Sequence, residues 1–319
     1  MFSIWFSRSQ YHKVIRSGPF YIRFKLTAWY KYFTNITEIV ISVKRVYPFV
    51  QSGMSDMEQR LYFTLDNRDQ RVFTVKDIIE ILQISEYRAR NIASFMVKKG
   101  AAERVKPGLF TRVPPHIILD KKHYHEDAIL IASKLIDEYF LSHYTAIQIH
   151  GLADRYSSYV YISSTSHQRS LKYHNNQIKF IKINPNRNFG VTEIEYNKEM
   201  ILVSDLERTI IDIVDRPRLS GGWIEVIDCL RNLDSIDETK LLKYLKEFNN
   251  KKTARIVGYL LNCLSNIDLP NSFNKQLSDF SGENKYYIDK NSPGSKVKGW
   301  NLVVPSRIRK EFYDQQQGY

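Results

Sequence analysis

The sequence predicts an α+β protein made of two differently built domains. Between residues 54 and 115 three helical patterns are followed by the pattern of a two-stranded hairpin, and beyond residue 115 helices alternate with a group of strand patterns. The chain has 319 residues, of which 43% are hydrophobic, so it is long enough to bury more than one core. We therefore expect a helical domain with a hairpin over residues 54–115, and a mixed domain with a mainly antiparallel sheet and several helices over residues 116–319.

Residues 1–53 differ in composition from the rest of the chain. They contain eight Lys and Arg residues, one acid, Glu38, and 13 aromatic residues, without a clear heptad, strand or turn pattern. Two interpretations are open: the segment lies upstream of a true start at Met54, or it is a basic aromatic arm that lies on nucleic acid or membrane. Because of this ambiguity, its positive charge is not an argument for DNA binding.

Three helices are predicted between Met57 and Gly100. The first covers MEQRLYFTLDN, and the second covers TVKDIIEIL, in which Thr74 and Asp77 have the spacing of a capping box. The third covers SEYRARNIASFMVKKG and is expected to begin at Ser85 and end at Gly100.

The order of elements in the first domain is that of a winged helix-turn-helix. The short link QIS between the second and third helices has the length of the helix-turn-helix turn. The next segment, AAERVKPGLFTRV, alternates around Pro107-Gly108 like a two-stranded hairpin. In DNA-binding proteins of this kind the last helix of the motif enters the major groove.

The third helix has a polar face that is suited to DNA. If Ala89, Ile92 and Met96 point inward, five other side chains lie on the opposite side: Tyr87, Arg90, Asn91, Ser94 and Lys98. Arginine and asparagine make bidentate hydrogen bonds with guanine and adenine edges, and lysine suits phosphate. Three basic residues of the hairpin are predicted to contact a DNA backbone or minor groove: Arg104, Lys106 and Arg112. A winged helix used for protein contacts is the alternative.

The second domain is predicted to begin with two helices after the prolines of TRVPP, the shorter helix ending at Gly151. Strand patterns follow in SYVYISST, RSLKYHNNQIKFIKI, GVTEIEY and EMILVSD, separated by asparagine-containing breaks. Later helices are expected from Ser204 and near Trp223–Leu233, Asp237–Phe248 and Thr253–Leu264.

The stretch SDLERTIIDIVDRP, residues 204–217, has the pattern of a helix. Ser204 and Glu207 are spaced as a capping box, and Pro217 is expected to end the helix. Its apolar residues repeat at helical intervals: Leu206, Ile210, Ile213 and Val214. Three charged residues lie off this stripe, where they are expected to form a solvated ion-pair face: Asp205, Arg208 and Asp212.

Several motifs, in this order along the chain, resemble a known family. They are VKPGLFTRVP, LSHYTAIQIHGL, VSDLERTIIDIVDRPRLSGGWIEVI and YYIDKNSPGSKVKGWNLVVP. From about Met57 to Pro305 the chain resembles the AbiEi-type antitoxin family of type IV toxin–antitoxin systems. The residues that match the motifs of the second domain are His150, Gly151, Glu207, Arg208 and Asp212.

The resemblance implies an antitoxin that represses its own promoter. In such proteins the winged helix binds double-stranded promoter DNA, and the C-terminal domain opposes a nucleotidyltransferase toxin without necessarily binding it. The chain departs from the family in residues 1–53 and in lacking a strongly basic second domain, so we confine the expected DNA contacts to residues 54–115. The alternatives are a transcription regulator whose second domain senses a ligand or mediates assembly, and a nuclease-like enzyme.

No catalytic or metal-binding signature stands out in the sequence. Glu193, Glu195 and Lys198 lack the acid-x-Lys spacing of a metal-dependent nuclease. His123 and His125 lie on a polar linker, where histidines are usually solvated. Two other histidines are expected to serve packing or hydrogen bonding: His143 and His150. We therefore expect a protein that is not an enzyme and has no cofactor or metal.

Two further features bear on the cellular compartment. Cys229 and Cys263 lie in apolar helical patterns, which predicts two reduced core residues. There is no run of 18 apolar residues, and the first residues do not have the order of a signal peptide. We therefore expect a cytoplasmic protein with no membrane partner.

Overall fold

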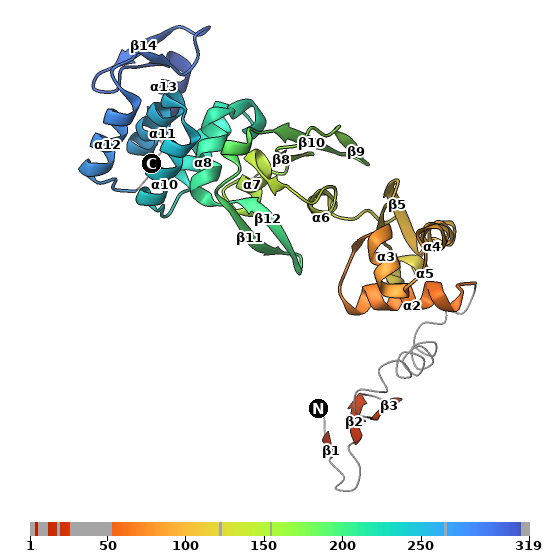
Figure 1. Cartoon of the computed structure of the whole chain (residues 1–319). Coiled ribbons are helices and arrows are strands. Elements are labelled where there is room, and N and C mark those ends of the chain that lie inside the picture. Colours follow the sequence, from red (N-terminus) through yellow and green to blue (C-terminus); the bar gives the residue numbers. More distant parts are fainter. Residues whose placement is uncertain are drawn as a thin grey trace. The chain divides into compact units, whose positions relative to one another are not determined.

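The computed structural model describes residues 53–313, apart from residues 121–122, 154 and 265–266, together with the backbone of three short strands before residue 53 (Figure 1). The chain divides into two compact units, Met1–His125 and Glu126–Tyr319. The division therefore lies later in the chain than the predicted boundary at residue 115. Both units contain helices together with largely antiparallel sheets, and the protein is of the α+β class, as predicted.

The N-terminal strands are not among the predicted elements. Strands β1 (Ile4–Trp5), β2 (His12–Ser17) and β3 (Phe20–Lys25) form an antiparallel sheet in the order β1-β2-β3. The side chains of this segment lie outside the described residues. The predicted basic aromatic arm, with its contacts to nucleic acid or membrane, therefore stays a prediction.

The first unit contains the predicted three helices and hairpin. Its helices are α2 (Asp56–Asn67), α3 (Val75–Leu82), α4 (Glu86–Lys98) and α5 (Pro115–Asp120). Its strands are β4 (Val72–Thr74), β5 (Ala102–Lys106) and β6 (Leu109–Arg112), which form an antiparallel sheet in the order β4-β6-β5. The order of α2, α3, α4 and the β5–β6 hairpin is that of a winged helix-turn-helix.

Local capping explains where the helices of this motif begin and end. Thr74 and Asp77 form the predicted capping box at the start of α3, with the Thr74 amide donating to Asp77 Oδ2 at 2.6 Å. Gln83 then ends α3 in the left-handed conformation, with φ of 55°, and Ser85 is the N-cap of α4. Gly100, with φ of 70°, follows α4 and turns the chain into β5.

The second unit is organised around a six-stranded mixed sheet. Its strands are β7 (Phe140–Leu141), β8 (Tyr159–Ser164), β9 (Leu171–Tyr173), β10 (Asn176–Lys182), β11 (Val191–Tyr196) and β12 (Glu199–Ser204). They lie in the order β11-β12-β7-β8-β10-β9. The hairpin pairs are antiparallel, but β8 pairs parallel with β10, and β12 pairs parallel with β7. The sheet was predicted to be mainly antiparallel, and it also includes these two parallel pairings. The short strand β7 was not predicted.

Helices complete the core of the second unit. They are α6 (Ala128–Ser133), α7 (His143–Ile149), α8 (Leu206–Asp215), α9 (Trp223–Arg231), α10 (Glu238–Phe248) and α11 (Lys251–Leu264). Figure 1 shows α8 between the strands of the sheet and helices α10 and α11, and α8 also contacts α7. The apolar side of α8 is fully buried, with Ile210 and Ile213 at 0% exposure. Helices α7 to α11, which lie close to the predicted ranges, thus contribute to one continuous core.

The C-terminal part adds elements that were predicted only as a tail. They are α12 (Asn271–Ser281), β13 (Tyr286–Tyr287), β14 (Gly294–Val297), β15 (Leu302–Pro305) and α13 (Ser306–Tyr313). The three strands form a small sheet in the order β13-β15-β14. Among the residues that the structure describes, no helix has both the length and the apolar character needed to span a membrane.

Close packing between α11 and α12 leads to the first testable prediction. Gly258 lies in α11, and a Cβ atom there would overlap Leu277 Cδ2 and lie 2.9 Å from Cζ3 of Trp300. Although alanine normally favours an exposed helix by about 1 kcal/mol over glycine, Gly258→Ala is expected to lower the free energy of unfolding by roughly 1–3 kcal/mol because Leu277 is buried. Chemical denaturation of the full chain measures this change.

The double variant Gly258→Ala/Leu277→Ala tests the cause. Removing the Leu277 side chain makes room for the new Cβ, so the two substitutions together should cost less than the sum of their separate effects. A Gly258→Ala variant as stable as the unmodified chain would contradict the proposed overlap.

Candidate functional site

Helix α4 presents a polar surface opposite its buried side. Ala89, Ile92 and Met96 are buried against the core of the first unit, as predicted. The five side chains that the sequence places on the opposite face are exposed or partly exposed: Tyr87, Arg90, Asn91, Ser94 and Lys98. Tyr87 is 75% exposed. The helix therefore has an accessible surface of hydrogen-bonding and basic groups.

Arg90 is held by a local ion pair on this surface. Its Nη2 lies 2.5 Å from Oε1 of Glu86, one turn earlier, and both side chains are more than half exposed. Exposed pairs of this kind contribute little, about 0.3–0.5 kcal/mol within a helix. Arg90 can therefore exchange Glu86 for a DNA base or phosphate at small cost.

Aromatic rings accompany the basic groups of α4 and the hairpin. The Nζ atoms of Lys98 and Lys99 lie 5.6 Å and 5.9 Å from the centroid of Phe95, a half-exposed residue that was not among the predicted DNA contacts. On β5, Arg104 is exposed, and its guanidinium lies 5.7 Å from the Phe110 ring. Cation–π contacts hold such cations over the rings and so fix where they point.

Two residues of the hairpin differ in accessibility from the prediction. Lys106 is only partly exposed, and burial lowers the pKa of its ammonium group. Arg112 is buried, its Nη1 lies 2.6 Å from Oδ1 of Asp66, and its guanidinium lies over the ring of Tyr62. The prediction that Arg112 contacts DNA is therefore wrong for this structure, because its charge is used to join β6 to α2.

The start of helix α8 also differs from the predicted capping box. Asp205 is the N-cap, and its Oδ1 accepts from the Arg208 amide at 2.9 Å. Ser204 is the last residue of β12, and its hydroxyl lies 2.8 Å from that of Thr209. The helix therefore begins one residue later than predicted and ends before Pro217, as predicted.

The charged side of α8 is buried and not solvated. Arg208 is 1% exposed, and its Nε donates to Oδ1 of Asp212 at 3.0 Å. Its Nη1 donates to the carbonyl oxygens of Arg187 and Phe189 at 2.6 Å and 3.1 Å. The guanidinium also lies 4.6 Å from the centroid of the Phe189 ring and 5.3 Å from that of Phe248. The expected solvated ion-pair face is therefore a buried network.

Glu207 and Asp205 join α8 to α10. Lys240 Nζ lies 2.9 Å from Oε2 of Glu207 and 3.1 Å from Oδ2 of Asp205, and Tyr244 donates its hydroxyl to the same Asp205 oxygen at 3.0 Å. Burial alone would lower the pKa of Lys240, but its hydrogen bonds to Glu207 and Asp205 raise the pKa overall. Glu207 and Asp205 thus hold the N-terminal end of α8 against α10.

His150 and Gly151 end helix α7. His150 Nε2 lies 2.7 Å from the carbonyl oxygen of Ser204, so this nitrogen carries the proton in that hydrogen bond. Gly151 has φ of 72°, a conformation that favours glycine, and its amide donates to the Gln148 carbonyl. Both residues therefore have structural roles: His150 attaches α7 to the end of β12, and Gly151 ends the helix.

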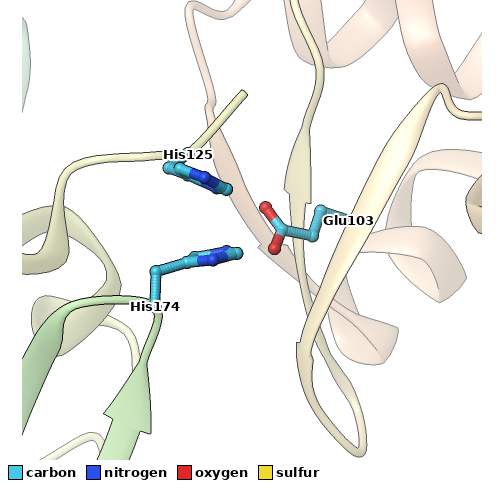
Figure 2. A group of neighbouring side chains, drawn as sticks. All are labelled: Glu103, His125 and His174. Carbon is cyan, nitrogen blue, oxygen red and sulfur yellow. The ribbon is translucent and has the colours of Figure 1, made fainter. Parts of the chain in front are cut away.

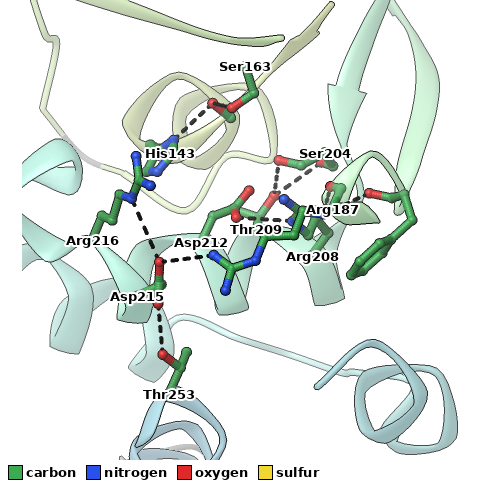
Figure 3. Close-up of polar contacts among 12 residues, drawn as sticks. His143, Ser163, Arg187, Ser204, Arg208, Thr209, Asp212, Asp215, Arg216 and Thr253 are labelled. Carbon is green, nitrogen blue, oxygen red and sulfur yellow. Dashed lines mark hydrogen bonds and ion pairs between the residues drawn. The ribbon is translucent and has the colours of Figure 1, made fainter. Parts of the chain in front are cut away.

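A polar cavity of about 300 Å³ lies beside the buried network. Figure 3 shows the polar contacts around Arg208, Asp212 and Asp215. Two motif residues, Arg208 and Asp212, line it. The other charged residues at its wall were not predicted as site residues: Arg187, Asp215 and Arg216. Arg187 lies before β11 and Asp215 ends α8, and these positions meet only when the sheet and α8 pack. No local pattern in the sequence indicates that these residues lie close together.

His143 also lines this cavity. It is 3% exposed, and its Nδ1 lies 2.9 Å from the hydroxyl of Ser142, which accepts from Ser163 (Figure 3). Burial, followed by the positive charges of Arg216 and Arg208, lowers the pKa of His143 to about 3. The imidazole is therefore neutral at pH 7, which agrees with its predicted role in packing and hydrogen bonding.

The remaining candidates are surface groups. Glu193 and Glu195 are exposed on the edge strand β11, where charged side chains prevent pairing with other strands. His123 and His125 are exposed, as predicted for the linker, and Figure 2 shows His125 on that segment. Figure 2 also shows Glu103, on β5, and His174, which occupies the turn between β9 and β10 and lies edge-on to Tyr173.

One of the two cysteine predictions is wrong. Cys229 is buried, as predicted, and burial raises the pKa of its thiol to about 12. Cys263 is exposed, because it lies on the side of α11 that is turned away from the core.

Comparisons with known proteins support the fold. No family model matches the sequence, and no curated protein matches it. The structure is similar to the crystal structure of the Rv2827c protein from Mycobacterium tuberculosis, with a TM-score of 0.53 and 14% sequence identity, over 79% of this chain and 92% of that chain. At this identity the similarity concerns the fold alone. The resemblance to the AbiEi family therefore stays a prediction.

The buried Arg208 network leads to a stability prediction. Arg208→Met keeps an unbranched, though shorter, side chain but removes every donor to Asp212 and to the two carbonyls. Leaving one partner of a buried ion pair without the other typically costs about 3–5 kcal/mol, and we expect a loss of that size in the free energy of unfolding. Chemical denaturation measures it, with Arg218→Met, an exposed arginine, as the matched control.

A second substitution separates the ion pair from general packing. Arg208→Met/Asp212→Leu removes both charges, so it should be more stable than Arg208→Met alone. A loss below about 1 kcal/mol for Arg208→Met would show that this pair does not hold the structure together.

The neutral His143 predicts a pH dependence of stability. Between about pH 6.5 and pH 3 the unfolded chain takes up a proton that folded His143 does not accept, so stability falls as the pH falls through this window. The contribution is at most about 1.4 kcal/mol per pH unit. In His143→Asn, which suits the φ of 53° at this position, the free energy of unfolding should fall less steeply between pH 6 and about pH 4.

The control for this experiment is His167→Asn at an exposed histidine. All other groups titrate in the variants as in the unmodified chain, so only the difference in slope is compared. If His143→Asn and the unmodified chain lose stability equally steeply on acidification, His143 is not held neutral by the fold.

Proposed function

We propose that this protein is a DNA-binding antitoxin that represses its own promoter. The winged helix-turn-helix of the first unit would bind double-stranded operator DNA, and the second unit would oppose a nucleotidyltransferase toxin. The single observation that supports DNA binding most directly is the face of α4, which buries Ala89, Ile92 and Met96 and leaves Arg90 and Asn91 exposed to solvent. The proposed antitoxin role rests on the family motifs in the sequence.

The proposed DNA contacts divide by their chemistry. Arg90 and Asn91 have the side chains that read guanine and adenine edges in the major groove. Lys98, near the end of α4, and Arg104, on the hairpin, are exposed cations suited to phosphate. Lys106 is a weaker contributor because it is partly buried, and Arg112 is excluded from the interface by its pair with Asp66.

The test of this proposal is binding of the full chain to a duplex from upstream of its own gene and to a scrambled duplex, at two salt concentrations. Arg90→Ala should weaken specific binding by about 1–3 kcal/mol, because one base contact is lost. Arg104→Ala should weaken binding to both duplexes similarly and reduce the salt dependence, because one phosphate contact is lost. Fluorescence anisotropy provides the dissociation constants.

Arg169→Ala, in the loop between β8 and β9 of the second unit, is the matched control for loss of one exposed positive charge. Equal affinity for the two duplexes, or unchanged specific binding by Arg90→Ala, would contradict the assignment of α4 as the helix that reads the operator. The antitoxin half is tested separately, by co-expression with a nucleotidyltransferase toxin encoded beside the gene. Growth should be restored by the full chain, and continued growth arrest would contradict the antitoxin role.

A further inference from the structure

The cavity beside Arg208 has the composition of a ligand-binding site. Its volume of about 300 Å³ is at the lower end of the range for small-molecule pockets. Its lining combines charged and polar side chains with three apolar ones, Ile181, Ile183 and Phe248. Arg216, whose side chain is 46% exposed, connects the cavity with solvent. A small molecule can therefore enter a space that is already formed.

Positive charge is in excess at this wall. Arg208 is matched by Asp212 at 3.0 Å. Arg187 and Arg216, in contrast, share one carboxylate oxygen, Oδ2 of Asp215, at 4.0 Å and 3.7 Å (Figure 3). These are long ion-pair distances, and the other oxygen of Asp215 already accepts from Asn250 and Thr253. Two guanidinium groups thus face the cavity with one carboxylate between them.

Asp212, which also lines the cavity, has one buried carboxylate oxygen without a partner in the described part of the chain. It is 4% exposed, and its Oδ1 is bonded to Arg208, but its Oδ2 has no hydrogen-bond partner among the residues that the structure describes. Leaving a buried acceptor unsatisfied costs free energy, about 1–3 kcal/mol for a neutral group and more for a charged one. This oxygen is covered by protein atoms, so a ligand could donate to it only if the Asp212 carboxylate turned toward the cavity.

His143 shows that the site is held in an unfavourable local conformation. It lines the cavity with φ of 53°, in the left-handed region, although it is not a glycine or asparagine. Such a conformation costs of the order of 1–3 kcal/mol and persists where the surrounding structure imposes it, often at ligand sites. Its side chain is neutral, so the excess positive charge of the wall comes from the arginines.

We propose that this cavity binds a small phosphate monoester, with the phosphate between Arg187 and Arg216. A phosphate has three acceptor oxygens, which match two planar guanidinium groups better than a carboxylate does. Its charge of about −1.5 to −2 at pH 7 also suits the excess positive charge at the wall. This site is separate from the proposed DNA interface and does not depend on the antitoxin role.

The test is isothermal titration calorimetry of the full chain with ribose 5-phosphate. Binding of one molecule per chain is expected, with weaker or no binding of ribose, which lacks the phosphate, and of gluconate, which carries a carboxylate instead. Arg216→Gln and Arg187→Gln should each weaken binding about tenfold or more, because each removes a charged hydrogen-bond donor. Arg218→Gln, an exposed arginine outside the cavity, should leave it unchanged.

Each alternative outcome overturns the proposal. Absence of binding by the unmodified chain, preference for gluconate, or an equal effect of Arg218→Gln would each exclude a phosphate site in this cavity. A 5′-phosphorylated oligonucleotide that binds through Arg216 while ribose 5-phosphate does not would assign the site to a nucleic-acid end. Circular dichroism and unfolding curves of the glutamine variants establish that any loss of binding occurs in folded protein.

Discussion

The structure of the second unit depends on one buried charge, the guanidinium of Arg208. A charge in this position is tolerated only if its donors find acceptors, because an unpaired buried charge costs several kcal/mol. Asp212 satisfies one side, and the carbonyls of Arg187 and Phe189 satisfy the other. The segment that leads from β10 to β11 is therefore fixed against α8, and the wall of the cavity is fixed with it.

Gly190 is part of the same constraint. It follows Phe189 with φ of 67°, and a Cβ atom at this position would lie 2.7 Å from Cβ of Arg208. The close approach allows the backbone before β11 to reach the guanidinium. Because Gly190 has no side chain, the Arg208 side chain can be buried against this backbone.

Local signals in the sequence predicted the first unit well. The capping box at Thr74, the end of α4 at Gly100 and the Pro107-Gly108 turn each depend on residues close together in the chain, and they were predicted from those residues. Arg112 was mispredicted because its pair with Asp66 connects elements distant in sequence. A basic residue in a hairpin has the same local pattern whether it faces solvent or the core.

The second unit was predictable as a set of elements but not as a site. The helical pattern of residues 204–217 located α8, yet Arg208 and Asp212 were expected in solvent, because a helical wheel shows only which residues share a face. The α10 helix and the segment before β11 cover that face. The cavity residues Arg187 and Asp215 were missed for a similar reason: they meet only when α8 packs against the sheet.

The order of strands also has a consequence for synthesis of the chain. β7 contributes only Phe140 and Leu141 to the middle of the six-stranded sheet, where it pairs with β8 on one side and with Val203 of β12 on the other. The two halves of the sheet cannot join until β12 has left the ribosome, whereas the contacts of the winged helix are complete much earlier. Since domains generally fold as units during translation, the winged-helix unit is expected to be folded while the second unit is still an open hydrophobic surface. That interval is when the second unit is most exposed to aggregation or to binding by a chaperone.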